Sequence, residues 1–492
     1  MEEKNDSAEQ IGTPQTPLKQ KSSVKGNQAV RAAFWYLVCN FLLKGISFVT
    51  TPIFTRLMST SDYGIFSTYN SYVSILTVVT TLDLYACVQI SKHDFKGENN
   101  SFISSVLFLS SISVLAFYGL LKVVMLFTGN LFELPEHMID IMFLYIFFEN
   151  AFTIMQTQHR AYLRYRMMVC FTVISTILSV VFGVWFVKIM QQDKYWGRII
   201  AGVIPAVIIG IYAMVSIYVK GHCLIRKQFW RYAVTVCIPL IPHHLSGRIL
   251  ASFDRIMINS ICGSVDAAIY SLAYNVAAII EVVWFSFNSA WTPWFYDKMA
   301  DGKTEDIKKA VKPYIIVFSF FIVGAIAAGP EVVKVLGTRA YWEGKWIIPP
   351  VVLGLFFQFM YSLYINIEMY NKKTKTIAVG TTTAAMLNVA LNYIFIPILG
   401  YIAAAYTTLV GYILMFLFHY LQSGKLEKRD LYGKKFLFFV VMGMCLFTVV
   451  MSALYQTIII RYALLGIIAI AVFWKYKKEI LNTIMSYMGK KN

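Results

Sequence analysis

The sequence predicts an all-α polytopic membrane protein with about fourteen transmembrane helices, and three observations support this fold class. Of the 492 residues, 58% are hydrophobic and only 14% are charged, whereas an ordinary soluble chain carries about 25% charged residues. The apolar residues fall into runs of about 20, the length that crosses a bilayer as a helix. These runs lack the strict alternation of β-barrel strands. A soluble globular fold is therefore excluded.

The chain begins with a polar segment. Residues 1–30 contain Pro14 and Pro17 and no apolar core, which predicts a disordered cytoplasmic tail and excludes a cleavable signal peptide. The first apolar run must then direct membrane insertion itself. Hydropathy places the fourteen candidate spans at 33–56, 66–90, 102–127, 138–158, 167–187, 199–219, 232–258, 266–296, 313–328, 346–370, 376–396, 401–422, 436–454 and 457–474.

The distribution of cations predicts the orientation of these spans. The 44 Lys and Arg residues against 26 Asp and Glu give a net charge of +18, which suits either nucleic acid or the cytoplasmic face of a membrane. With the N-terminus in the cytoplasm, 32 of the 44 cations lie in cytoplasmic segments. The outer segments hold eight: Arg56, Lys188, Lys194, Arg198, Lys334, Arg339, Lys345 and Arg461. This asymmetry predicts that both termini are cytoplasmic.

The same distribution counts against nucleic acid as a partner, because the cations are scattered over short loops without interleaved aromatic residues. The seven cysteines show neither CxxC nor Cys/His spacing, so we predict no disulfide, no metal site and no cofactor.

An internal repeat divides the chain at an offset of about 204 residues. DYGIFS at 62–67 matches DAAIYS at 266–271, RYR at 164–166 resembles KTK at 373–375, and GRIIA at 197–201 matches GYIAA at 400–404. We predict two six-helix lobes in a parallel pseudo-two-fold repeat, a class in which the substrate path lies between the halves. The expected parts are a tail (1–30), an N-lobe with spans 1–6 (31–222), a C-lobe with spans 7–12 (223–424), and spans 13–14 with a cytoplasmic C-terminus (425–492).

Two cations lie deep inside predicted spans and are separated by the repeat offset: Lys44 in span 1 and Arg248 in span 7. A cation at the bilayer midplane costs at least about 2.5–3.5 kcal/mol, so each should face a polar interior. We predict that they form a cationic cleft between the lobes, where Arg248 binds a phosphate or pyrophosphate bidentately and Lys44 acts as a point charge. The alternative is that each cation pairs with a buried acid such as Asp83, Glu149 or Glu281.

Further candidates share these polar stripes or carry an intramembrane charge. The candidates for the cleft or a gate are Asn40, Arg56, His244, Asp254 and Arg255. The candidates for ion coupling or for a counter-ion are Asp83, Glu149, Glu281 and Glu368, with interhelical hydrogen bonding as the alternative. Asp62 and Asp266 begin the second helix of each lobe, where an acid complements the helix dipole.

Several motifs resemble those of the bacterial polysaccharide flippases. They are TPIFTRL at 51–57 followed by DYG at 62–64, PLIPH at 239–243, LSG at 245–247, DRIMI at 254–258, AWTPWFY at 290–296, KTK at 373–375, and the Asn388/Asn392 pair. The resemblance runs from about residue 30 to 422. This family shares a superfamily with the multidrug and toxin extruders and the lipid II flippase.

The resemblance implies two lobes that alternate between inward and outward openings. It implies an undecaprenyl-pyrophosphate-linked oligosaccharide as substrate, flipped from the inner to the outer leaflet of the bacterial cytoplasmic membrane for cell-surface polysaccharide synthesis. The implied partners are this lipid-linked oligosaccharide, the bilayer, and polysaccharide polymerase or assembly proteins. A multidrug or cation antiporter is the first alternative, although its cleft should be anionic. A membrane-embedded glycan polymerase or acyltransferase is the second; we expect no enzyme, because such chemistry usually needs a large outer domain.

Overall fold

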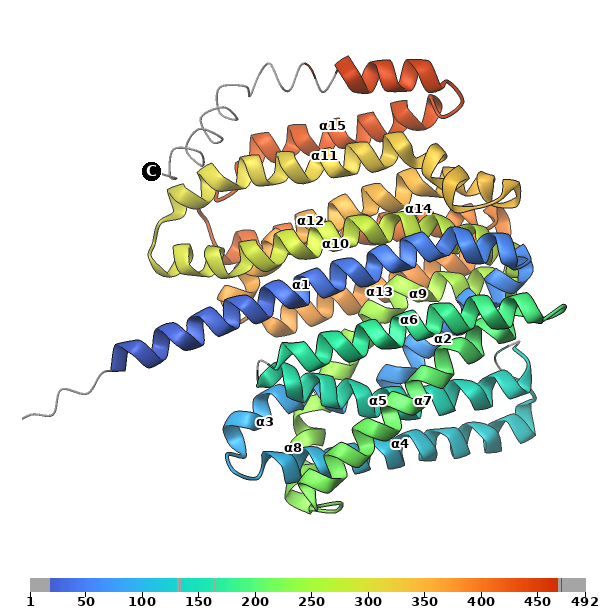
Figure 1. Cartoon of the computed structure of the whole chain (residues 1–492). Coiled ribbons are helices and arrows are strands. Elements are labelled where there is room, and N and C mark those ends of the chain that lie inside the picture. The colour runs from blue at the N-terminus through green and yellow to red at the C-terminus, as the bar shows by residue number, and fades with distance from the viewer. Residues whose placement is uncertain (1–17, 131, 133, 163, 468–469, 471–492) are drawn as a thin grey trace, which may run out of the picture.

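All secondary-structure elements in the described part of the chain are helices, and none is a strand (Figure 1). The computed structural model describes residues 18–130, 132, 134–162, 164–467 and 470; the side chains at 18–34, 36, 37, 40, 136 and 165 lie outside this description. Eleven of the described helices are long and apolar enough to cross a membrane, or twelve if the bent pair α2–α3 is one span. The protein is therefore a multi-pass membrane protein.

The first half of the bundle comprises seven α-helices and one 3₁₀ turn: α1 (Leu18–Leu57), α2 (Thr60–Thr80), η1 (Leu84–Cys87), α3 (Val88–Asp94), α4 (Asn99–Thr128), α5 (Glu136–Ala161), α6 (Tyr165–Ile189) and α7 (Lys194–Gly221). α1 begins at Leu18, directly after Pro17, so it includes residues 18–30 of the segment for which the sequence predicts a tail. No proline follows before Pro52, so nothing in this stretch interrupts the helical hydrogen bonds. Residues 1–17 lie outside the described ones.

The second half comprises α8 (Lys227–Cys237), η2 (Ile238–Leu240), α9 (Ile241–Cys262), α10 (Ser264–Ala300), α11 (Thr304–Leu336), η3 (Arg339–Ile347), α12 (Ile348–Tyr370), α13 (Thr374–Leu399) and α14 (Ile402–Leu426). After it come α15 (Lys434–Ala453) and the short apolar helix Ile458–Ile467. α1 and this short helix occupy the places of the first and fourteenth expected spans. Span 14 continues into residues outside the described ones.

The packing of the two halves follows one pattern. α6 packs against α7 as α13 packs against α14, α5 against α7 as α12 against α14, and α1 against α6 as α9 against α13. This is the arrangement that a parallel repeat of six-helix units requires. In Figure 1, α1 runs diagonally across the bundle, with α4, α5 and α7 below it and α10, α11, α12 and α15 above it. The halves therefore meet along α1, α2, α9 and α10.

Two spans are broken where the halves meet. α2 and η1–α3 form a 58° bend, with Leu82 and Asp83 in the left-handed backbone region at φ 52° each. Two serines of α4 donate hydrogen bonds to carbonyls at this break: Ser113 to that of Thr80, and Ser110 to that of Thr81, which also accepts from the Leu84 N–H. The other break is η2, which contains Pro239.

The η2 break changes the packing partner of its span. α8 packs against α4 and η1 in the first half, and its Phe229 lies in a buried aromatic cluster with Phe95 and Phe102. After the break, α9 packs against α13, α2 and α10. The change of partner thus occurs near the 3₁₀ turn Ile238–Leu240, where Pro239 has no backbone N–H to continue the helical hydrogen bonds.

Candidate functional site

The two halves are joined at the end of the bundle where α1 finishes and α2 and α10 begin, which we call the closed end. A Cβ on Gly64 would lie 1.8 Å from the backbone oxygen of Ser264, so α2 and α10 touch through their backbones here. Ser61 Oγ and Ser264 Oγ are hydrogen-bonded at 2.7 Å. Arg56, a predicted gate residue, donates to the carbonyl of Val335 at 3.0 Å. The closed end is therefore sealed by contacts between halves.

A polar cavity of about 380 Å³ lies between the halves beside this seal. Its lining comes from α1, α2 and α7 on one side and from α9 and α10 on the other: Ser47, Thr50, Thr51, Phe54, Tyr63, Phe66, Ser67, Asn70, Ser71, Arg198, Ser252, Arg255, Ser271 and Asn275. We call it the interlobe cavity. Among these described lining residues two are arginines, one from each half, and none is acidic. Such a cavity suits an anion.

Arg198 is the arginine of the first half. Its guanidinium lies 4.5 Å from the ring centroid of Phe54 and 5.0 Å from that of Phe66, and Nη1 donates to Ser179 Oγ at 3.1 Å. Gly183 makes this possible, because a Cβ there would lie 2.9 Å from the Phe54 ring and 3.4 Å from Arg198 Cδ. The aromatic faces hold the guanidinium by cation–π attraction and leave further N–H groups for a ligand.

Arg198 also reaches a second cavity, of about 470 Å³, that lies within the first half between α1, α5, α6 and α7. Ser47 and Thr50 line both cavities as well, so the two spaces adjoin. Glu149, a predicted counter-ion, lines the second cavity together with Gln156 and Thr172. The first half thus has a hydrophilic interior, which the hydroxyl-rich stretches of α1 and α6 supply.

Arg255 is the arginine of the second half, and its neighbour Asp254 anchors α9. Arg255 lies 4.6 Å from the ring centroid of Tyr274 and donates to the carbonyl of Ala251 at 2.9 Å. Asp254 is only 1% exposed. Its carboxylate accepts hydrogen bonds from Tyr270 (2.6 Å), Thr408 (2.8 Å) and Asn392 (2.7 Å). Asp254 is therefore a structural acid that joins α9, α10, α13 and α14, and it faces away from the interlobe cavity.

The Asp254 network makes a prediction about stability. Asp254→Ala should leave three buried donors unsatisfied, and we expect a loss of about 3–5 kcal/mol of unfolding free energy. The measurement is the thermal unfolding of the detergent-solubilised protein. The control is Asp140→Asn, at a half-exposed acid paired with Lys122 at 2.7 Å in the first half, where we expect little change. Equal melting of Asp254→Ala and wild type would contradict the anchoring role.

Lys44 and Arg248 are both exposed, and neither lines the two cavities described above. Lys44 Nζ lies 4.0 Å from Glu281 Oε2 on α10, and the side chains are 51% and 39% exposed. Each of these cations nevertheless lies on the same helix as a residue that lines the interlobe cavity. Ser47 lies three residues after Lys44 and Ser252 lies four after Arg248, and both serines line the interlobe cavity. Since α1 and α9 both finish at the closed end, the two cations lie one helical turn further from it.

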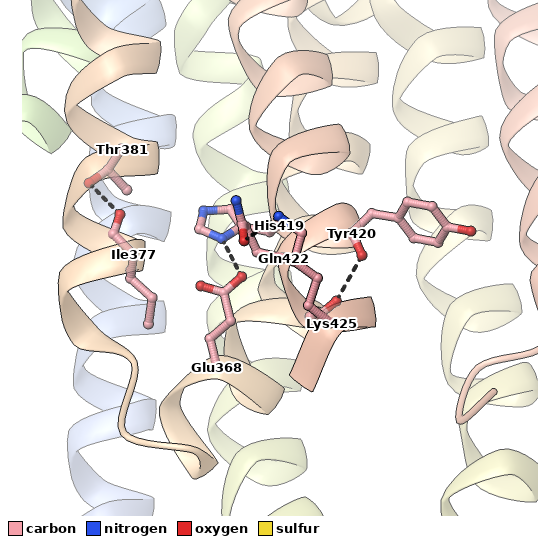
Figure 2. A network of polar contacts seen from close by, with 8 residues as sticks. Glu368, Ile377, Thr381, His419, Tyr420, Gln422 and Lys425 are labelled. Atoms are coloured by element: carbon pink, nitrogen blue, oxygen red, sulfur yellow. Dashed lines mark hydrogen bonds and ion pairs between the residues drawn. The ribbon is translucent and has the colours of Figure 1, made fainter. Parts of the chain in front are cut away.

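Two carboxylate–histidine pairs connect other elements. Asp83, 2% exposed in the break of span 2, is hydrogen-bonded to His244 Nδ1 on α9 and so ties the two halves together. Glu368 Oε1 lies 2.9 Å from His419 Nδ1, joining α12 to α14, and both side chains are completely buried (Figure 2). The side chain of Asn40, another predicted cleft residue, lies outside the described ones.

The sequence of the first half and part of the second matches a known protein family. Residues 29–299, more than half of the chain, match the family model described as "Polysaccharide biosynthesis protein". The chain belongs to this family.

Relatives and solved structures agree with membership in the polysaccharide biosynthesis family. An uncharacterized membrane protein of Methanocaldococcus jannaschii is 23% identical, over 91% of this chain and 94% of its own. "Lsg locus putative protein 1" of Haemophilus influenzae is 20% identical, over 72% of this chain and 88% of its own. The lipid II flippase MurJ in an inward closed conformation superposes with a TM-score of 0.65 at 15% identity, covering 92% of this chain and 99% of that one.

A multidrug resistance MATE transporter in an inward-facing conformation superposes with a TM-score of 0.56 at 13% identity, covering 80% of this chain and 96% of that one. The predicted fold class, an all-α polytopic bundle, is thus confirmed by these likenesses and by the described helices. The expected resemblance to the polysaccharide flippases is confirmed by the family match.

The sequence predicts an outer loop at Arg198, so this arginine is absent from the candidate site residues named above. α7 begins at Lys194, so Arg198 lies on the second turn of a helix and faces inward. The signal was present: Arg198, Gly202 and Ala206 recur at i, i+4 and i+8, and all three line the second cavity. Asp62 and Asp266, in contrast, lie in the first turns of α2 and α10 as predicted.

Proposed function

We propose that the protein is a flippase that moves an undecaprenyl-pyrophosphate-linked oligosaccharide repeat unit from the inner to the outer leaflet of the bacterial cytoplasmic membrane, for synthesis of a cell-surface polysaccharide. The observation that carries this proposal is the interlobe cavity, which presents Arg198 and Arg255 from opposite halves. A pyrophosphate diester is an anion with many acceptor oxygens, and guanidinium groups bind such oxygens through charge-assisted hydrogen bonds. The hydroxyl and amide groups of the lining suit a sugar.

The proposed mechanism is alternating access between two lobes. The packing pattern supports an N-lobe built from α1–α7 and a C-lobe built from α9–α14, with α15 and the following helix outside the repeat. Under the orientation that the cation distribution predicts, with both termini in the cytoplasm, the closed end faces outward. The arrangement described here is then the one that admits a headgroup from the cytoplasmic side. Opening would break the contacts of Arg56 and Ser61 with the C-lobe.

Lys44 and Arg248 fit this scheme as approach cations. They lie one turn from the interlobe cavity on the cytoplasmic side of it, and each belongs to the same helix as cavity-lining residues. Glu281 near Lys44 holds a compensating charge while no headgroup is present. An incoming pyrophosphate would compete with Glu281 for Lys44, and a polyprenyl tail would remain in the lipid. Small cationic drugs are disfavoured as substrates by the same positive field.

The experiment is flipping of a fluorescent undecaprenyl-pyrophosphate-linked trisaccharide in proteoliposomes, read as protection from an external reductant. The wild-type protein should flip this lipid, and a labelled phosphatidylcholine should not move faster than in empty vesicles. Lys44→Ala and Arg248→Ala should each reduce flipping about tenfold, since a hydrogen bond to a charged group contributes about 1.5–3 kcal/mol. Lys122→Ala, at a cation paired with Asp140 outside the cavities, is the control. Unchanged flipping in the Lys44→Ala/Arg248→Ala double variant would overturn the approach role.

A further inference from the structure

The second cavity, enclosed by α1, α5, α6 and α7, has room for a ligand that a pyrophosphate between the halves does not fill. Its volume is about 470 Å³, compared with about 380 Å³ for the interlobe cavity. A water molecule occupies about 30 Å³ in the liquid, so the space far exceeds what a single small ion needs. Proteins hold small organic ligands in cavities of about 300–1,000 Å³. The second cavity therefore has the size of a site for an organic group.

Hydrogen-bond acceptors are abundant on the polar wall of the second cavity. Thr172 Oγ1 donates its hydrogen to the carbonyl of Met168 at 2.8 Å, and Thr176 Oγ1 donates to the carbonyl of Thr172 at 2.9 Å. Each hydroxyl oxygen keeps lone pairs that can accept. Gln156 Nε2 donates to Thr172 Oγ1 at 3.2 Å, which leaves the amide oxygen of Gln156 available. Glu149 adds the oxygens of a carboxyl group. A ligand that fits this wall brings its own donors.

The strong donors are gathered toward the interlobe cavity. Arg198 and Arg255 both line it, and a guanidinium group has five N–H donors and no acceptor. The Arg198 guanidinium lies against the rings of Phe54 and Phe66, which belong to the interlobe cavity, and donates to Ser179 Oγ, which lines the second one. Arg198 thus stands where the two cavities adjoin. The donors suit an anion, and the acceptors beyond them suit a group rich in hydroxyls.

The two cavities can hold neighbouring groups of one molecule. Ser47, Thr50 and Arg198 line both of them, so the spaces share a wall. In a pyrophosphate-linked oligosaccharide the first sugar is bonded directly to a phosphate. A phosphate that binds Arg198 therefore brings the attached glycan to the entrance of the second cavity.

The charge and shape of the second cavity favour an uncharged sugar. Its described lining contains one acid, Glu149, and one base, Arg198, so it holds no net charge for an ionic ligand. A metal ion or an ammonium group could use the acceptors, but it would meet the guanidinium charge of Arg198 in the same space. Tyr145 and Phe152 add aromatic surfaces against which the C–H face of a sugar ring can pack. Sugar hydroxyls supply the donors that the wall requires.

We propose that the second cavity is a subsite for an uncharged sugar of the glycan, and that Gln156, Thr172 and Thr176 determine which sugar is accepted. The subsite rests on the proposed function, because the sugar arrives attached to the pyrophosphate held between the halves. A sugar whose hydroxyls leave these acceptors unpaired binds less tightly, and this difference gives specificity. The headgroup site then has two parts, an anion site shared by both halves and a sugar subsite within the first half.

Gly202 allows the subsite to be filled with little disturbance of the helices. It lines the second cavity from α7, and a Cβ at this position would meet no atom within 4 Å. Gly202→Leu therefore places a side chain where the sugar would lie. Gln156→Met removes the amide group at nearly constant volume. The matched control is Gly119→Leu, at a helical glycine of α4 that also has open space and lines neither cavity.

The test compares the binding of two lipids to the full-length protein in detergent: undecaprenyl pyrophosphate alone, and the same lipid carrying an uncharged trisaccharide. Native mass spectrometry gives the Kd of each. The wild type and Gly119→Leu should bind the trisaccharide lipid about tenfold more tightly than the sugar-free lipid, since several hydrogen bonds are added. Gly202→Leu should bind both lipids equally, and Gln156→Met should lose most of the difference. Both variants should keep the wild-type Kd for the sugar-free lipid.

The outcomes separate the subsite from the flippase function. Equal affinity of the wild type for the two lipids would overturn the sugar subsite and leave the anion cavity intact. So would a full trisaccharide advantage in Gly202→Leu. A wild-type protein that shows the advantage but does not flip the trisaccharide lipid would contradict the flippase function and support the subsite. Binding of neither lipid would overturn the pyrophosphate site and the subsite together.

Discussion

Replacing Arg198 and Arg255 together by alanine is expected to abolish flipping of a pyrophosphate-linked glycolipid. The two guanidinium groups are the cations of the interlobe cavity, one from each half. Charge-assisted hydrogen bonds are worth about 1.5–3 kcal/mol each, so each single variant should lose about tenfold to a hundredfold in flipping rate at low substrate concentration. The double variant should lose the product of both factors if the residues act independently. The measurement is the initial flipping rate in proteoliposomes.

Charge and geometry can be separated at these positions. Arg255→Lys keeps the charge but not the planar fork of donors, and we expect it to retain part of the activity. Lys188→Ala removes an exposed cation at the end of α6, away from the cavity, and should leave the rate unchanged. A double alanine variant that flips as fast as wild type, at equal amounts of inserted protein, would contradict the anion cavity.

Gly64→Ala is expected to prevent the closed end from shutting. The added Cβ would lie 1.8 Å from the Ser264 carbonyl oxygen and 2.6 Å from its carbonyl carbon. Both atoms belong to the backbone of the first turn of α10, so no side-chain rotation relieves the clash. The halves must separate at this end. The expected result is a population shifted almost entirely to the open arrangement and a flipping rate reduced by at least tenfold.

The Gly64 prediction is checked with spin labels at the exposed positions Gln192 in the first half and Thr338 in the second, whose separation in liposomes reports closure. Gly119→Ala provides the matched control, because it also adds a methyl group to a helical glycine but meets no atom within 4 Å. That variant should give the wild-type distance distribution. A Gly64→Ala protein with a wild-type distribution would show that α2 and α10 do not need to touch for closure.

Local chemistry in the sequence was sufficient to predict a helical membrane bundle. Apolar runs of bilayer length identify spans without knowledge of their neighbours, since each helix satisfies its own backbone hydrogen bonds in lipid. The repeat offset relates Lys44 to Arg248, and the structure places each one turn from cavity-lining residues of its helix. The start of α1 at Leu18 was not predicted, because a polar helix beyond the membrane has no hydropathy signal.

The sequence by itself determined that this chain is a helical membrane protein with two related halves, because length and apolarity of a span are local properties. Only the tertiary structure decided which charged groups meet. It brings Arg198 from an apparent loop into a cavity opposite Arg255, gives Asp254 three donors from three other helices, and buries Glu368 against His419. These juxtapositions depend on helix rotation and on breaks such as that at Asp83. Both are set by packing between segments far apart in the chain.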